Sequence, residues 1–495
     1  MGKNGGKSIS YFGLVAMGIG CMLGTSWLLL TGTWLETAGG PLNLVVAFVL
    51  CILIELPFAF AYMEAIPMLP LPGGEVVYSY AAFGSRGGFA VGWAGILMNT
   101  IVFCWVDLAA VSLLDELFPA LGRTAVLYQV GDFPVTLPNL IVQLALAGAI
   151  LFIQLKGANV CASLAKIATV VLLVMCAIGL AVCFTHFDPA VYASDGGLDF
   201  DFSGSMALLS LLVFSVAGWE TVSKAAADAT GPAARKAGAA LITCLLLVTG
   251  ILCLVSTAVA GCMPWQEAVN RTAPFADVLV GLTGVPAVRV LFLVTAFVGA
   301  VGVMNSTLYS SAQMLYGLSR FGLVSERFSA LHPKYGTPAR CIWFTAAFVV
   351  LTPFTGKLLF LPLINIASLA TVVMWVMSLA AVLALRKTHP DWRRPVSMPG
   401  GRITAVCGIL ASVFLAGNLL VPFSPGALSP LEYALAAALA VLGLVLYHFR
   451  DRSLSDTERA RRILGGREKT PYPICRIPKN GRAGQMTGPP LHLVR

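Results

Sequence analysis

Charge is scarce in this chain, because Asp, Glu, Lys and Arg together make up only 11% of its 495 residues. Soluble proteins usually carry about a quarter, and 58% of this chain is hydrophobic, so its composition excludes a soluble globular protein. The five histidines lie far apart, without the His-rich motifs that membrane-embedded enzymes tend to show. The twelve cysteines are scattered without the spacing of a metal site or a disulfide framework, which favours apolar packing. We therefore expect no catalytic residue, no metal and no cofactor.

Long apolar runs are what the chain has in place of charge. Runs of about 20 residues are typical of membrane-spanning helices. Twelve such segments are centred near residues 25, 53, 100, 146, 173, 213, 249, 300, 347, 374, 412 and 439. No small-residue cleavage site follows the first, so we expect it to be retained. Short loops join the segments, which predicts an all-α polytopic membrane protein with twelve transmembrane helices.

The distribution of Lys and Arg predicts the orientation. If the N-terminus lies in the cytoplasm, only four of the 32 Lys and Arg fall outside, namely Arg123, Arg271, Arg289 and Lys357. Because cytoplasmic loops carry the excess of basic residues, we expect both termini inside, in a plasma membrane such as the bacterial inner membrane. The net charge of +9 then reflects topology and requires no nucleic-acid partner.

Three parts are expected along the chain: a cytoplasmic N-terminus at residues 1–10, a transporter domain at 11–449 and a cytoplasmic tail at 450–495. Arg, Gly and Pro dominate the tail, which predicts a mostly disordered segment that attracts anionic lipid headgroups. An alternative is that the tail plugs the cytoplasmic mouth, with His492 as a pH-sensitive element.

Two segments are interrupted in the same way. Segment 1, residues 12–37, carries Gly18, Gly20 and Gly24 in its middle, and segment 6, residues 206–232, is interrupted around Gly218. Unwound backbone at membrane depth persists only where it lines a cavity or is buried in protein. Two such segments in corresponding positions point to a transporter's substrate site, and their offset of five fits a five-plus-five inverted repeat with segments 11 and 12 appended.

The two breaks offer complementary chemistry. Unwinding in segment 1 would free the N–H groups of Gly24, Thr25 and Ser26 for a carboxylate. Unwinding at Ala217 and Gly218 would free carbonyls for an ammonium group, beside the indole of Trp219. Together these groups suit an α-amino acid. The alternative for segment 1 is that its glycines allow close helix packing.

The predicted site residues follow from these breaks and from a polar face in segment 8. The substrate-binding set is Gly20, Met22, Gly24, Thr25, Ser26, Phe214, Ala217, Gly218, Trp219 and Asn305.

Three intramembrane acids are candidates for gating or proton linkage, namely Glu220, Glu55 and Asp107. Glu220 could instead hold the segment 6 break open. Glu55 and Asp107 could carry a proton, contact a cationic substrate or simply bond a neighbouring hydroxyl or amide. Glu64 is expected to pair with a basic loop residue.

Several motifs resemble one known family. They are residues 20–25, residues 64–84 with Pro70-Leu71-Pro72-Gly73-Gly74-Glu75, Gly218-Trp219-Glu220 with Gly231-Pro232, and residues 315–320, 332–338 and 389–401. In order and spacing, over residues 11–405, this pattern is similar to that of the amino acid–polyamine–organocation (APC) transporters. The resemblance implies secondary transport of amino acids or related amines, by exchange or proton symport, with a site at segments 1 and 6. It also implies that Glu220 matches the family's carboxylate on segment 6.

Departures from the family pattern affect the expected mechanism. The family usually has Gly at Ser26 and a smaller aliphatic residue at Trp27, which predicts an altered carboxylate cradle. Ala312-Gln313 replaces a common Ser-Arg. Some members have a lysine in segment 5 where this chain has Leu172, and its loss favours exchange over lysine-linked symport. No acidic cluster suggests a sodium site.

Other function classes give different expectations. A second twelve-helix transporter superfamily usually has a basic signature between segments 2 and 3, which Ser85-Arg86-Gly87-Gly88 does not match. A polytopic membrane enzyme would need the clustered residues that are lacking here. A non-transporting amino-acid sensor on the same fold would need the same site, with the basic tail as its signalling element.

Overall fold

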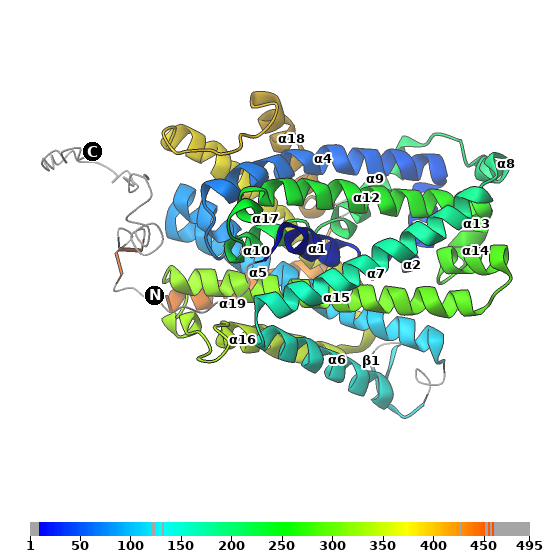
Figure 1. Ribbon diagram of the computed structural model, residues 1–495, viewed down its shortest axis with the longest axis horizontal. Helices are drawn as coiled ribbons and strands as arrows, with labels where there is room; N and C mark the ends of the chain where they lie inside the picture. The colour runs from blue at the N-terminus through cyan, green and yellow to red at the C-terminus, as the bar shows by residue number, and fades with distance from the viewer. Residues whose placement is uncertain are drawn as a thin grey trace, which may run out of the picture.

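A computed structural model describes residues 9–119, 124–130, 133–422, 424, 427–450, 454–455 and 458–459. These residues form a mostly helical bundle (Figure 1). The predicted tail, with His492, lies almost wholly outside the described residues, as do residues 1–8 and Arg123.

Ten helical segments of the described chain are long and apolar enough to cross a membrane. They are α1 (Tyr11–Met22) with α2 (Ser26–Leu29), α4 (Pro41–Met68), α5 (Glu75–Leu117), α6 (Leu137–Leu155), α7 (Ala158–Thr185), α12 (Ala237–Cys262), α15 (Ala287–Arg320), α17 (Phe360–Thr388), α18 (Arg402–Leu420) and α19 (Pro430–His448). The expected segments near residues 213 and 347 fall on shorter apolar helices, α9 (Phe202–Ser215) and α16 (Ala339–Leu351). The chain is an integral membrane protein.

Short elements join or extend these spans. They are α3 (Thr31–Ala38), α8 (Pro189–Tyr192), α10 (Thr221–Ala225), α11 (Pro232–Arg235), α13 (Trp265–Val269), α14 (Pro274–Thr283) and the 3₁₀ turns η1 (Ser194–Gly196), η2 (Ala226–Asp228), η3 (Glu326–Ser329) and η4 (Thr352–Leu359).

The all-α prediction is wrong for one segment between α5 and α6. There β1 (Val126–Val130) and β2 (Phe133–Thr136) pair as an antiparallel hairpin. Its residues are largely β-branched or aromatic, which suits a pleated surface. The hydroxyl of Tyr128 donates a 2.8 Å hydrogen bond to the carbonyl of Phe354, which ties the hairpin to η4.

The broken first segment lies at the centre of the bundle. α1 packs against α7, α12 and α15, and α5 packs along α15 and α17. In the most apolar stretch of α1 and α2, 89% of the residues are buried, against 11% in α19. Side chains such as Ile403 on α18 and Leu444 on α19 stay largely exposed. We conclude that α18 and α19 are peripheral and turn apolar faces toward lipid.

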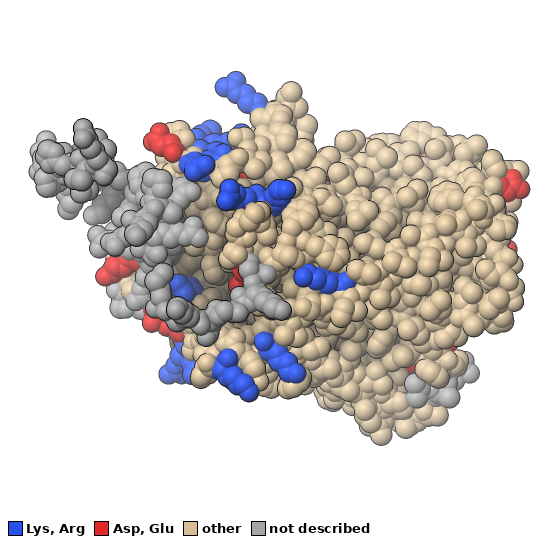
Figure 2. All heavy atoms as spheres, viewed as in Figure 1, with Lys and Arg blue, Asp and Glu red and all other residues tan. Residues whose placement is uncertain are grey.

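The two ends of the bundle differ in charge. The loops 321–338 and 389–401 lie at one end of the bundle, on the left in Figure 1, and Lys and Arg gather there (Figure 2). We call this the basic end. The hairpin, α8, α13 and α14 lie at the opposite end (Figure 1).

The prediction for Glu64 is confirmed at the basic end. Its wholly buried carboxylate forms ion pairs with Arg386 at the end of α17 and, at 3.2 Å, with Arg394 in the following loop. It also accepts a 2.7 Å hydrogen bond from the backbone N–H of Met398. Glu64 therefore fastens this loop to α4.

Candidate functional site

Segment 1 is interrupted where its glycines predict it. α1 ends at Met22, and α2 begins only at Ser26. The N–H of Leu23 still donates to the carbonyl of Ile19 at 2.7 Å, and the N–H of Gly24 donates to the carbonyl of Met22 at 3.2 Å. The N–H groups of Thr25 and Ser26 have no hydrogen-bond partner among the described residues. Two buried donors are therefore available at this break.

Segment 6 is interrupted in the same way between α9 and α10. The N–H of Ala217 bonds to Phe214 at 3.2 Å, and the N–H of Thr221 bonds to Gly218 at 3.0 Å. In the described part of the chain, no donor reaches the carbonyls of Val216 and Ala217. Gly218 has φ of 121°, a conformation that residues with a side chain rarely adopt. This break therefore exposes acceptors where the first exposes donors.

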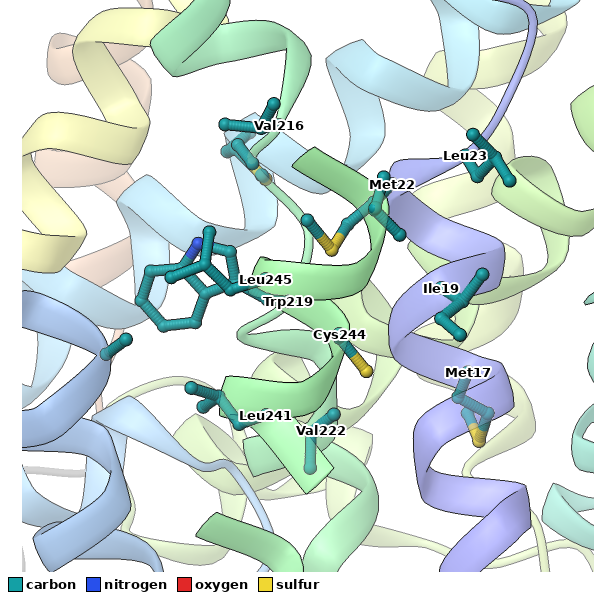
Figure 3. Close-up of a cluster of buried hydrophobic side chains, with 14 of the residues drawn as sticks. Met17, Ile19, Met22, Leu23, Val216, Trp219, Val222, Leu241, Cys244 and Leu245 are labelled. Carbon is teal, nitrogen blue, oxygen red and sulfur yellow. The ribbon is translucent and has the colours of Figure 1, made fainter. Parts of the chain in front are cut away.

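The two breaks touch each other. A Cβ atom on Gly218 would lie 3.1 Å from the backbone carbonyl carbon of Cys21, so a side chain there has no room. Figure 3 shows Met22 on α1 beside the stretch that carries Val216 and Trp219. Glycine is therefore required at position 218 for two reasons, namely its positive φ and the close approach of α1.

A cavity of about 40 Å³ lies beside the two breaks. Its wall consists of Cys21, Met22, Gly24, Thr25, Ser26, Leu30, Met98, Val102, Trp105, Val106, Phe214, Ser215, Ala217 and Val303. Six of these were predicted as substrate-binding residues: Met22, Gly24, Thr25, Ser26, Phe214 and Ala217. The volume suffices for water, whereas pockets for small-molecule ligands usually measure about 300 Å³ or more. In this conformation the two breaks therefore enclose too little space for an amino acid.

Sequence reasoning missed the apolar wall that α5 and α15 supply. Met98, Val102, Trp105 and Val106 come from α5, and Val303 comes from α15. The ring of Trp105 meets that of Phe214 edge-on, with centroids 6.2 Å apart. Apolar residues in a membrane span carry no mark that separates a cavity wall from a lipid-facing surface, so the sequence held no signal for them.

Four predicted residues do not line this cavity. Gly218 lies against Cys21 at the contact between the two segments, whereas Gly20 faces Ser306 on α15 and Thr169 on α7. Trp219 stacks on Trp375, with centroids 5.1 Å apart, and meets Tyr62 edge-on at 5.1 Å. Its indole is therefore part of a buried aromatic cluster.

Asn305 is engaged in a separate network. Its side-chain carbonyl accepts a 3.0 Å hydrogen bond from the amide of Gln154, and its own amide donates at 2.9 Å to the carbonyl of Cys161. These bonds link α15 to α6 and α7.

The acids at the breaks have different partners. Glu220 accepts a 3.0 Å hydrogen bond from the N–H of Gly218, while its other oxygen is buried without a hydrogen bond from any described residue. The indole N–H of Trp219 donates at 2.7 Å to Glu55, which also accepts from the thiol of Cys51 at 3.5 Å. Glu220 thus fastens the segment 6 break, and one indole links that break to α4.

Asp107 differs from the other two acids. It is wholly buried, and neither carboxylate oxygen has a hydrogen-bond partner in the described chain. The structure therefore brings Glu55 and Glu220 to the segment 6 break, whereas Asp107 follows Val106 of the cavity wall on α5.

A buried ion pair was not predicted. Lys224 on α10 was counted with the cytoplasmic basic residues, but its side chain is wholly buried, and its Nζ lies 2.9 Å from Oε1 of the equally buried Glu75. The loop before Glu75 approaches α10 closely, because a Cβ atom on Gly74 would lie 2.7 Å from Oγ of Ser223. The glycine pair Gly73-Gly74 was the available signal, since such a pair permits close backbone approach.

Comparison with known proteins identifies the family of this sequence. The sequence profile of the family described as amino acid permease matches residues 9–446. The branched-chain amino acid permease BcaP of Bacillus subtilis (strain 168) is 27% identical over 422 residues, which is 83% of this chain and 88% of that protein.

Two further relatives from the same organism match over similar lengths. The methylthioribose transporter is 27% identical over 406 residues, 80% of this chain and 85% of its own. The aspartate-proton symporter is 24% identical over 432 residues, 84% of this chain and 80% of its own. These matches confirm the resemblance to the APC transporters. The chain belongs to the amino acid permease family.

Proposed function

We propose that this protein transports α-amino acids with apolar side chains across the plasma membrane by alternating access. The observation that carries the proposal is the composition of the cavity beside the breaks. Free N–H groups lie on one segment and free carbonyls on the other, and no charged side chain is present in the wall.

Each part of such a substrate has a matching group. The N–H groups of Thr25 and Ser26 suit its carboxylate, and the carbonyl of Ala217, which also lines the cavity, suits its ammonium group. We therefore expect a molecule that carries only one of the two charges to bind more weakly, because one set of backbone groups would stay unpaired.

The apolar wall selects among amino acids. Met98, Trp105 and Val303 offer apolar surface and no partner for a charge. A charged side chain would lose its hydration here without compensation, which is costly. The printed name of the branched-chain permease fits this interpretation.

The architecture that accompanies this function is also a proposal. We place twelve membrane-crossing segments, with α9–α10 as the sixth and α16 as the ninth, in a five-plus-five inverted repeat followed by α18 and α19. The transporter domain spans 11–449, and the basic end faces the cytoplasm with residues 1–10 and the tail 450–495.

Exchange is the coupling mode that we favour over proton symport. Leu172 is buried on α7 at the position where some members have a lysine. Glu55 and Glu220 remain the groups that would carry a proton if symport is found.

Uptake into proteoliposomes tests the proposal. Labelled L-leucine is offered outside, with or without unlabelled L-leucine inside. Unlabelled valine, isoleucine and phenylalanine should compete, whereas aspartate and lysine should not. Uptake that needs internal leucine identifies exchange, and uptake driven by an imposed pH gradient into empty vesicles identifies symport.

A cavity-filling variant locates the site. Val303→Trp places an indole in the cavity wall and should reduce leucine uptake at least tenfold. Val294→Trp is the matched control, because Val294 lies on the same helix with 45% of its surface exposed. Competition by aspartate or lysine as strong as that by valine would refute the apolar class. Leucine binding without uptake would identify a sensor.

A further inference from the structure

A second and larger cavity opens at the basic end. Its volume is about 530 Å³, which lies within the range of small-molecule sites. The wall includes Lys156 at the end of α6, Asn159 at the start of α7, Asp228 after α10, Tyr309 and Gln313 on α15, and Lys334 in the following loop. We call it the vestibule.

Asp228 is an oriented carboxylate in this vestibule. The hydroxyl of Tyr309 and, at 3.2 Å, the amide of Gln313 both donate to its Oδ2. Its Oδ1 receives no hydrogen bond from any described residue. One oxygen thus fixes the side chain and the other is available to a cation such as an ammonium group.

Positive charge lies in the same wall. Lys156 and Lys334 both line the vestibule, and their side chains are largely exposed there. The Lys334 ammonium lies 5.2 Å from the ring of Tyr335, another residue of the wall, whereas the Lys156 ammonium lies 4.2 Å from the ring of Phe152, which is outside the wall. A carboxylate and two ammonium groups around one void of this volume suit a zwitterion.

The vestibule and the cavity beside the breaks lie along the same helix. Gln154 lines the vestibule and donates to Asn305 at 3.0 Å, and Asn305 is two residues from Val303 in the wall of the other cavity. The bonds among Gln154, Asn305 and Cys161 therefore join the wall of the vestibule to the helix that carries Val303.

We propose that the vestibule is a second binding site for the α-amino acid, occupied before the substrate enters the cavity at the breaks or after it leaves. Asp228 binds the ammonium group, and Lys156 and Lys334 bind the carboxylate. This inference rests on the proposed function and adds to it a site on one side of the membrane.

Equilibrium binding of labelled L-leucine to the purified full-length protein tests the number of sites. The wild type should bind two molecules per chain. Asp228→Asn keeps the side-chain shape and its acceptor for Tyr309 but removes the charge, so it should bind one. Val303→Trp should also leave one, at the vestibule. Asp391→Asn is the matched control, because it removes an exposed negative charge from a loop at the same end.

Exchange in proteoliposomes tests the sidedness. Asp228→Asn should raise the leucine concentration for half-maximal exchange about tenfold or more from the basic-end side and by less than twofold from the other. Asp228→Glu should recover part of the loss.

The outcomes separate the two proposals. Wild-type leucine exchange with no effect of Asp228→Asn on stoichiometry or sidedness overturns the vestibule site and leaves the proposed function standing. A single leucine per wild-type chain also overturns the vestibule site. If the wild type neither binds nor transports leucine or any other amino acid, both proposals fall.

Discussion

Removing Lys224 should destabilise the protein far more than removing an exposed lysine. Lys224 forms an ion pair with Glu75 in which both side chains are wholly buried and Nζ of Lys224 lies 2.9 Å from Oε1 of Glu75. At an effective dielectric constant of about 20, unit charges at this separation attract by about 6 kcal/mol. Lys224→Met leaves the Glu75 carboxylate buried without its partner, for which we expect a loss of about 3–5 kcal/mol.

The double variant separates the pair from simple side-chain loss. Glu75→Gln together with Lys224→Met removes both charges, so it should be more stable than either single variant. The assay is the midpoint of thermal unfolding in detergent, followed by tryptophan fluorescence at one fixed scan rate.

Lys236→Met serves as the control for the pair, since Lys236 is exposed beside α11, and its effect should stay within about 0.5 kcal/mol. Equal midpoints for Lys224→Met and Lys236→Met would refute the energetic reasoning. So would a double variant as unstable as the sum of the two singles.

Two further predictions concern the segment 6 break. Gly218→Ala should lower the free energy of unfolding by about 1–3 kcal/mol and abolish leucine uptake, because a Cβ atom meets Cys21 and φ of 121° strains any residue but glycine. Gly250→Ala on α12 is the control, because no atom lies within 4 Å of the added carbon. Equal uptake by both variants would contradict this prediction. Glu220→Gln should fold normally, because an amide oxygen can still accept the hydrogen bond from the N–H of Gly218, which is 3.0 Å long in the structure. The variant should nevertheless impair uptake or change the pH dependence of uptake. Uptake unchanged between about pH 5 and 8 would remove Glu220 from the transport mechanism.

Where local backbone chemistry decides the structure, the sequence was sufficient. Glycines within apolar segments, followed in one case by Glu220, predicted where both breaks lie. The expected free groups were wrong at Gly24, whose N–H bonds to Met22, and at Gly218, whose carbonyl accepts from Thr221. A basic loop residue was also predicted as the partner of Glu64, because a buried carboxylate needs a positive charge nearby, and Arg394 fills that role.

Where the outcome depends on which helices meet, the sequence was not sufficient. Trp219 was expected in the site wall and instead stacks on Trp375, a residue 156 positions away. Lys224 was assigned to the cytoplasm because charge rules count residues and do not detect a partner such as Glu75. Met98 and Trp105 gave no signal, since any span contains similar apolar residues.

The clamp at Glu64 limits how the molecule can move. One carboxylate is bonded to Arg386 at the end of α17, to Arg394 and to the N–H of Met398 just before α18. Any rotation of α4 must therefore carry the end of α17 and the start of α18 with it, or break several charge-assisted bonds at once. In the alternating access that we propose, α4, the end of α17 and the start of α18 are therefore expected to move together as one rigid body.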